Sequence, residues 1–226
     1  MNEKPEKDAV GAEEVLREST ENTVDTQQET VDEAEKSGEK SRELYEWVQA
    51  MLWAVLPVVL LFTFVIRMIG VDGSSMVPSL QDGDRLLVLD SALCGGFEYG
   101  DIVVLHKEVF HGAPVVKRVI AVEGQTVDID FSAGHVFVDG ILLTENYIAE
   151  PTTTNKGTRF PLTVEKGHVF VMGDNRNRSD DSRNPLLGQV DTRYILGKAV
   201  FLAFPGEDSV TEERDFSRIG IIGEVE

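Results

Sequence analysis

The sequence predicts a mainly β protein, in which a compact β-sheet domain follows a single N-terminal transmembrane helix. Two observations lead to this fold class. Residues 47–66 are an apolar run of 20 residues without a charge, and a helix of that length crosses the ~30 Å hydrocarbon core of a bilayer. Residues 70–226 hold 18 of the 20 glycines, which separate short runs of Val, Ile and Leu, as is typical of an all-β domain.

The segment before the apolar run, residues 1–46, is strongly acidic. Its first 43 residues hold 14 acidic and 6 basic side chains and so carry −8 of the net charge of −19. These 43 residues contain no aromatic side chain and little apolar periodicity, so they cannot bury enough surface to offset chain entropy. We expect a disordered cytoplasmic tail. The negative charge of the whole chain argues against nucleic acid as a partner, because phosphate recognition needs a basic face.

Residues 47–69 are predicted to form the transmembrane helix. Trp47 and Trp53 lie near one end of it, as tryptophans do at membrane interfaces. A buried core helix would ordinarily carry a polar stripe, and a cleaved signal peptide would be followed closely by a small-x-small site. The basic residues on either side are few, so the charge rule favours only weakly a tail inside the cell and a following domain outside it.

The β-rich domain is predicted over residues 70–206, with a small β insert at about 124–166 and a C-terminal tail over 207–226. Asp139-Gly140 lies between two apolar runs and predicts a hairpin with a two-residue type I′ turn. The expected strands are residues 85–89, 102–105, 115–122, 127–130, 136–138, 169–172 and 194–204.

Metal and cofactor chemistry is not expected. The one cysteine, Cys94, excludes an internal disulfide and a cysteine-rich metal site, and we do not expect it to take part in catalysis. The four histidines show neither an HExxH motif nor the His/Cys spacing of zinc sites. We therefore expect no metal and no cofactor.

Three segments differ from the β background, and each also has an ordinary structural explanation. Residues 73–80, GSSMVPSL, have the composition of a loop and follow the apolar run closely. In residues 115–120, VVKRVI, strand alternation points Lys117 and Arg118 to opposite faces, one toward solvent and the other toward the apolar side. Residues 173–183, GDNRNRSDDSR, follow a strand and form either a solvated turn or a buried polar network.

A lysine on the apolar face would have unusual chemistry. Burial disfavours the charged ammonium and lowers the lysine pKa from its usual value of about 10.4. A neutral amine beside a serine acts as a general base. The alternative for Lys117 is an edge-strand lysine that prevents aggregation.

In this order, behind an N-terminal membrane span, four segments resemble the motifs of bacterial type I signal peptidases. The resemblance extends from the span to about Phe204, and it implies a membrane-bound serine endopeptidase with a Ser-Lys dyad. Relatives in the endoplasmic reticulum are similar but carry a histidine in place of Lys117. The segments are Ser75–Leu80, Gly100–Val104, Lys117–Gly124 and Gly173–Arg183.

The resemblance assigns roles residue by residue. It implies that Ser75 is the nucleophile and Lys117 the general base. Met76 and Pro78 match residues that shape the loop of the nucleophile. Ser179 matches a serine that hydrogen-bonds to the lysine amine and orients it, and Asp181 and Arg183 match a supporting pair.

The substrate implied by the resemblance is a membrane-tethered preprotein, cut after small residues at positions −1 and −3 (Ala-x-Ala) through an acyl-enzyme. Other implied partners are membrane lipid and, in the vicinity, the secretion translocon. An extended substrate would add as a strand beside residues 71–75 or 115–117. The candidate walls of the pocket for small side chains are Val71, Met76, Leu80 and Val116.

One position departs from part of the family. Some members carry a serine two residues before the nucleophile, and its hydroxyl contributes to the oxyanion hole; the residue there is Gly73. We expect the oxyanion to depend on the Ser75 backbone N–H and a second donor that the sequence does not identify.

Two other interpretations remain. A soluble, self-cleaving Ser-Lys peptidase with a related β core is disfavoured by the membrane span. A membrane-anchored binding or scaffold protein without catalysis would leave Ser75 and Lys117 dispensable.

Overall fold

The computed structural model describes residues 42–63, 65–108, 112–208 and 213–222. The chain divides into a unit up to Val59 and a unit from Leu60 onward, and each is described by itself. Except for residues 42–46, the predicted disordered tail lies outside the described residues.

A single long helix, Arg42–Thr63, carries most of the apolar run. Its 22 residues rise about 33 Å, enough to cross the hydrocarbon core of a membrane. The predicted helix bounds of 47–69 are wrong at both ends, because the helix begins at Arg42 and residues 66–70 form a strand. Residues 66–70 pair with residues 85–89 in an antiparallel ladder. Their backbone N–H and C=O groups are therefore bonded across the sheet and are not available for the hydrogen bonds of a longer helix.

From Ile66 onward the structure is almost entirely β. The mainly β fold class behind one apolar helix is confirmed, and each predicted strand is present within one residue of its expected bounds. The strands are β1 (Ile66–Gly70), β2 (Arg85–Asp90), β3 (Ile102–Leu105), β4 (Val115–Val122), β5 (Thr126–Asp130), β6 (His135–Val138), β7 (Ile141–Leu142), β8 (Leu162–Thr163), β9 (His168–Met172), β10 (Val190–Asp191), β11 (Ile195–Phe204) and β12 (Gly220–Ile221). Short 3₁₀ turns are η1 (Ser91–Leu93), η2 (Arg176–Arg178), η3 (Thr192–Tyr194) and η4 (Phe216–Arg218).

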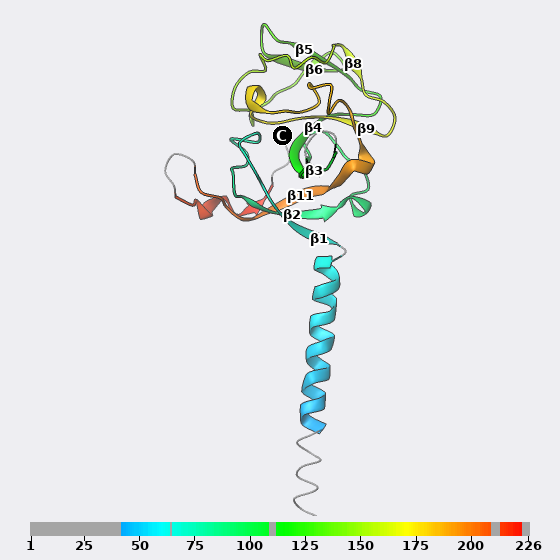
Figure 1. The fold of residues 1–226 in the computed structure, drawn as a ribbon, viewed down its shortest axis with the longest axis vertical. Helices are drawn as coiled ribbons and strands as arrows, with labels where there is room; N and C mark the ends of the chain where they lie inside the picture. Colours follow the sequence, from blue (N-terminus) through cyan, green and yellow to red (C-terminus); the bar gives the residue numbers. More distant parts are fainter. Residues whose placement is uncertain (1–41, 64, 109–111, 209–212, 223–226) are drawn as a thin grey trace, which may run out of the picture. The chain divides into compact units, whose positions relative to one another are not determined.

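The strands form two antiparallel sheets. The larger has the order β1-β2-β11-β3-β4-β9-β10, with β12 paired to β11, and the smaller has the order β7-β6-β5-β8. Figure 1 shows β5, β6 and β8 gathered on the far side of β4 from β1 and β2. Strand β11 pairs with β2 along one edge and with β3 along the other, and the bulges at its register shifts bend the sheet. The predicted hairpin joins β6 to β7, with the φ angles of Asp139 (52°) and Gly140 (77°) both positive, as a type I′ turn requires.

Both faces of β4 are covered by apolar clusters. Val116 packs in a cluster with Val71 and Met76, whereas Val119 belongs to a second cluster made with β3, β9 and β11. The prediction that either Lys117 or Arg118 faces solvent is therefore wrong, since each is only 3% exposed. Their side chains do alternate, but β4 is a central strand that lies between β3 and β9, and no face of it is open to water.

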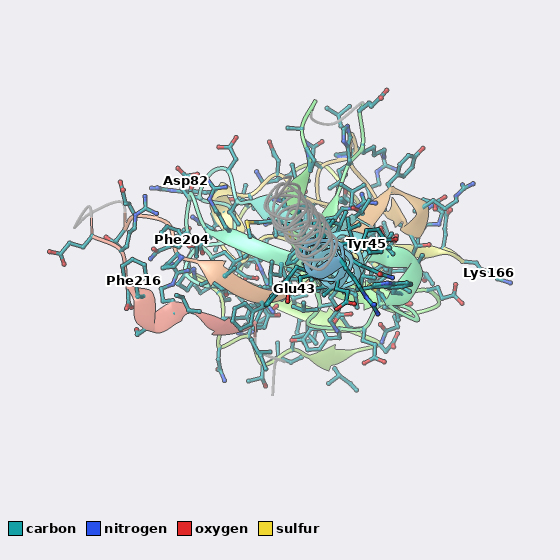
Figure 2. All side chains as sticks on the ribbon, turned by 90° about the horizontal axis from the view of Figure 1, so that it is seen from below. Glu43, Tyr45, Asp82, Lys166, Phe204 and Phe216 are labelled. Atoms are coloured by element: carbon teal, nitrogen blue, oxygen red, sulfur yellow. The ribbon has the colours of Figure 1, made fainter. Side chains whose placement is uncertain are left out.

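The folded domain extends beyond the predicted boundary at residue 206. The ring centroids of Phe216 and Phe204 are 5.7 Å apart, and β12 pairs with β11. Figure 2 labels both phenylalanines. Arg218 donates hydrogen bonds to both carboxylate oxygens of Asp84, at 3.0 and 2.7 Å. Asp84 is fully buried and also accepts the backbone N–H of Gly206 at 2.7 Å. The segment at the C-terminal side of β11 thus supplies the counter-ion of a buried carboxylate.

We expect Arg218→Ala to lower the free energy of unfolding by about 3 kcal/mol, because it leaves the Asp84 carboxylate buried without its counter-ion. Chemical denaturation of the detergent-solubilised chain measures this. Arg193→Ala is the control, since Arg193 pairs with Asp191 while 86% exposed and should cost less than about 1 kcal/mol. Equal losses in the two variants would contradict the assignment.

Candidate active site

Ser75 and Lys117, 42 residues apart in the chain, meet in the folded domain. The Lys117 amine donates a hydrogen bond to Ser75 Oγ at 2.7 Å and another to the carbonyl of Val116 at 2.9 Å. Lys117 extends from the central strand β4, and Ser75 lies in the loop that follows β1. The two side chains that the sequence predicts as a dyad are therefore within proton-transfer distance.

The side chain of Lys117 is almost completely shielded from water. Desolvation lowers the pKa of Lys117 from 10.5 to about 8, although the carboxylates of Asp181, Asp180 and Asp174 act in the opposite direction. At a pKa near 8, roughly one tenth of the amine is uncharged at pH 7. Burial therefore supplies a neutral amine without help from a histidine.

Each of these three carboxylates has its own cation. Asp181 pairs with Arg183 at 2.7 Å, with both side chains fully buried, and Asp174 pairs with Arg118 at 2.7 Å. The more exposed Asp180 pairs with Lys156 at 3.3 Å. Because each carboxylate is compensated, its field at the lysine is reduced, and desolvation remains the larger effect on the pKa of Lys117. The predicted pair of Asp181 and Arg183 is brought together here.

The loop of the nucleophile is fixed mainly by backbone contacts. The N–H of Leu80 donates to the carbonyl of Met76 at 2.9 Å, and Met76 is fully buried. Pro78 follows a cis peptide bond and forms an isolated β-bridge with Ile148. Gly73 has a φ of 86°, a value that favours glycine. The Ser75 N–H makes no hydrogen bond with any residue that the structure describes, so it is free to bind an oxyanion.

Ser179 lies at the site, but its predicted hydrogen bond to the lysine amine is not present in this structure. Its hydroxyl is buried and has no partner among the described residues. A Cβ added to Gly173 would lie 2.2 Å from Ser179 Oγ and 2.4 Å from the carbonyl oxygen of Ser75. Only a glycine allows β9 to end this close to both serines.

A groove of about 350 Å³ opens beside the dyad. Residues 71–75 and residues 113–117 line it, together with Arg178 and Asp180. Two predicted wall residues, Val71 and Val116, line the groove. The other two, Met76 and Leu80, are buried beside them in the same apolar cluster.

Strand β4 has an unpaired edge at the groove, and residues 71–75 are partly paired. In β4, residues 115–118 pair with β3, but the pairing with β9 begins only at Arg118. Along residues 71–75, Val71 pairs backbone groups with Asp84 and Gly83 on one side. With respect to the described residues, the edge of β4 at residues 115–117 that faces away from β3 has no paired strand, whereas in residues 71–75 the carbonyl groups of Ser74 and Ser75 already accept hydrogen bonds from Asn175.

Sequence reasoning missed the polar network around Arg118. Its guanidinium donates to both oxygens of Asp174, at 2.8 and 2.7 Å, and to the carbonyl of Gly100 at 2.8 Å. It also lies 4.2 Å from the ring centroid of Tyr147, whose pKa is raised by burial. A second arginine, Arg176, is fully buried and pairs with Glu145. Glu145 and Tyr147 lie in a long loop whose sequence gives no signal for this role.

Among the described residues, no three His, Cys, Asp or Glu side chains are grouped as a metal site. The carboxylates nearest the dyad are bound to cations of the protein. The chemistry that this arrangement allows is proton transfer and nucleophilic attack by the protein's own side chains.

Comparison with known proteins decides the family. The sequence model described as "Signal peptidase, peptidase S26" matches residues 44–204. The chain belongs to this signal peptidase family. The predicted family is thus confirmed, and the match covers both the apolar helix and nearly the whole β domain.

Curated signal peptidases are similar over most of their length. Signal peptidase I of Bacillus licheniformis is 37% identical over 182 residues, which are 76% of this chain and 94% of that protein. The probable signal peptidase I-1 of a Synechocystis strain is 38% identical over 71% of this chain and 82% of that protein. The crystal structure of an Enterococcus faecalis signal peptidase I is 30% identical over 46% of this chain and 96% of that chain, with a TM-score of 0.39.

The depressed pKa of Lys117 in this signal peptidase has a consequence for stability. Below pH 8 the folded state must bury a charged amine, whereas the unfolded lysine stays charged up to about pH 10.5. Wild-type stability therefore rises with pH between these values. Because Lys117→Met removes the buried charge, we expect this variant to be more stable than wild type at pH 7. The difference between their free energies of unfolding should shrink by about 3 kcal/mol between pH 7 and pH 10.5. Denaturant unfolding of both proteins across this range measures the difference, and a constant difference would contradict a dry amine.

Proposed function

We propose that this protein removes N-terminal signal peptides from translocated preproteins, as a membrane-anchored serine endopeptidase in which Ser75 and Lys117 form the dyad. The family gives the class of reaction. The observation that carries the assignment of residues is the 2.7 Å contact between the buried Lys117 amine and Ser75 Oγ.

In the proposed first step, neutral Lys117 removes the proton of Ser75 as Ser75 Oγ attacks the scissile carbonyl carbon. The hydrogen bond between the two groups then runs from hydroxyl to amine. The negative oxygen of the tetrahedral intermediate is bound by the free Ser75 N–H. The new ammonium of Lys117 protonates the leaving nitrogen, the C–N bond breaks, and the signal peptide stays attached to Ser75 as an ester.

Water completes the reaction. Lys117, again neutral, takes a proton from a water molecule that attacks the ester carbonyl, and then returns the proton to Ser75 Oγ as the ester breaks. Ser179 remains our proposal for the group that orients the amine. Its buried hydroxyl, unpartnered within the described part of the chain, is available to accept a hydrogen bond from Lys117.

The groove suits an extended substrate with small side chains near the cut. We propose that the substrate lies in the groove lined by residues 71–75 and 113–117 and adds as a strand beside residues 115–117, the unpaired edge of β4, or beside residues 71–75. Val71 and Val116 form apolar walls, and Met76 and Leu80 are buried in the same cluster. Such walls admit alanine and exclude larger side chains by clash, consistent with cleavage after Ala-x-Ala.

The helix Arg42–Thr63 anchors the enzyme in the same membrane as its substrate. Sharing a bilayer raises the effective concentration of enzyme and preprotein for each other. Because cleavage follows translocation, we propose that residues 1–41 are cytoplasmic and that the β domain is extracytoplasmic, near the secretion translocon and membrane lipid. A non-catalytic scaffold is disfavoured, since it gives no reason for a buried lysine against a serine.

Ser75→Ala and Lys117→Ala should each reduce processing of an Ala-x-Ala preprotein by at least about 1,000-fold, because each removes one member of a pair that acts as a unit. Cleavage of a radiolabelled preprotein by purified enzyme in detergent measures this. Ser132→Ala, at an exposed serine that does not line the groove, is the control and should process the preprotein near the wild-type rate. Substantial turnover by either dyad variant would overturn the assignment.

The pH dependence of kcat/KM should follow the deprotonation of Lys117. Because the general base must be uncharged, the rate should rise about tenfold per pH unit below the pKa and reach half of its plateau near pH 8. Initial rates with a fluorogenic Ala-x-Ala peptide between pH 5.5 and 10 test this. A rate that still rises steeply to pH 10 would mean that the amine has an ordinary pKa.

A further inference from the structure

Asn175 makes two contacts with the loop of the nucleophile, and the dyad assignment does not use it. Its side-chain Nδ2 donates to the carbonyl of Ser74 at 3.1 Å, and its backbone N–H donates to the carbonyl of Ser75 at 3.0 Å. Asn175 is only 7% exposed. One residue therefore holds two consecutive carbonyl groups at the nucleophile.

The side chain of Asn175 is diverted from its usual local role. Asn175 is the N-cap of η2, and asparagine at an N-cap normally accepts a hydrogen bond from the backbone of its own turn. The corresponding aspartates of η1, η3 and η4 do so, but the side chain of Asn175 makes no capping bond. It contacts Ser74 instead, 101 residues earlier in the chain.

The residue before Asn175 is fixed to the strand of the general base. Asp174 accepts two hydrogen bonds from Arg118, the immediate neighbour of Lys117 in β4. Gly173, one residue earlier, approaches the Ser75 carbonyl so closely that a Cβ would be 2.4 Å from it. Residues 173–175 therefore connect the strand that carries the amine to the loop that carries the hydroxyl.

We propose that Asn175 is a positioning residue, which holds the Ser75 hydroxyl at the Lys117 amine through the carbonyl groups of Ser74 and Ser75. The proposal rests on the proposed function of that pair. Asn175 acts on the placement of the oxygen and not on the burial of the amine. Its loss should lower kcat while KM and the pH midpoint of the reaction stay nearly unchanged.

The test compares Asn175→Ala with Asn177→Ala in the full chain in detergent. Asn177 lies in the same η2 turn, but it binds the loop at 151–154. Its Oδ1 accepts the N–H groups of Thr153 and Thr154, and its Nδ2 donates to the carbonyl of Pro151. Asn177→Ala thus removes more hydrogen bonds than Asn175→Ala and none at the nucleophile, so it controls for a purely structural effect.

We expect Asn175→Ala to lower kcat by about 10- to 100-fold, the range expected for a misplacement near 1 Å. KM should change less than about threefold, and the pH midpoint should stay where the wild type has it. Asn177→Ala should lower the melting temperature at least as much yet keep kcat within about threefold. Asn175→Asp should lose at least as much kcat as the alanine variant, because a carboxylate cannot donate to the Ser74 carbonyl.

The proposal is overturned if Asn175→Ala keeps kcat within about threefold of wild type, if its pH midpoint moves, or if Asn177→Ala loses as much kcat. Ser75→Ala and Lys117→Ala are measured in the same assay. If those two are inactive while Asn175→Ala is fully active, only the role of Asn175 fails. If either of them is active, the proposed dyad itself fails.

Discussion

Desolvation of one amine, that of Lys117, constrains the rest of the structure. A lysine is neutral near physiological pH only if burial outweighs every nearby negative charge. The fold buries the lysine on a central strand, β4, whose two faces are covered by separate apolar clusters. It reduces the effect of the nearby negative charges by pairing the carboxylates of Asp174, Asp181 and Asp180 with Arg118, Arg183 and Lys156. The buried ion pairs beside the dyad thus allow charged residues to lie next to a neutral amine, although buried pairs contribute little net stability by themselves.

The polar motif after β9 serves both partners of the dyad. Asp181 accepts the N–H of Gly173 at 3.1 Å as well as pairing with Arg183, so the compensating charges also hold the backbone in place. The same stretch meets the nucleophile loop through Asn175. Neighbouring residues of this one segment therefore both compensate negative charge near Lys117 and contact the loop of the nucleophile. This explains why so polar a stretch is buried at the end of a strand.

The sequence predicts the strands well because Gly and Asp separate the apolar runs, and it predicts the dyad because the motifs occur in a specific order. It does not predict that Arg118 is buried, since alternation gives opposite faces but not whether both are covered. Nor does it place the end of the helix at Thr63, because apolar residues continue to Ile66 and beyond Arg67, and Ile66–Gly70 joins the sheet only through pairing with the distant strand β2. Glu145 and Tyr147 were missed for a related reason: their contacts with Arg176 and Arg118 depend on how a long loop folds back over β4.

The central claim, that Lys117 is buried at its serine and has a pKa well below that of a hydrated lysine, is tested most directly by NMR. Lysines labelled with ¹³C at Cε would be titrated in the detergent-solubilised enzyme, and the Lys117 signal assigned by its loss in Lys117→Met. We expect that signal to titrate near pH 8. A midpoint near 10.5, as in a hydrated lysine, would contradict the account.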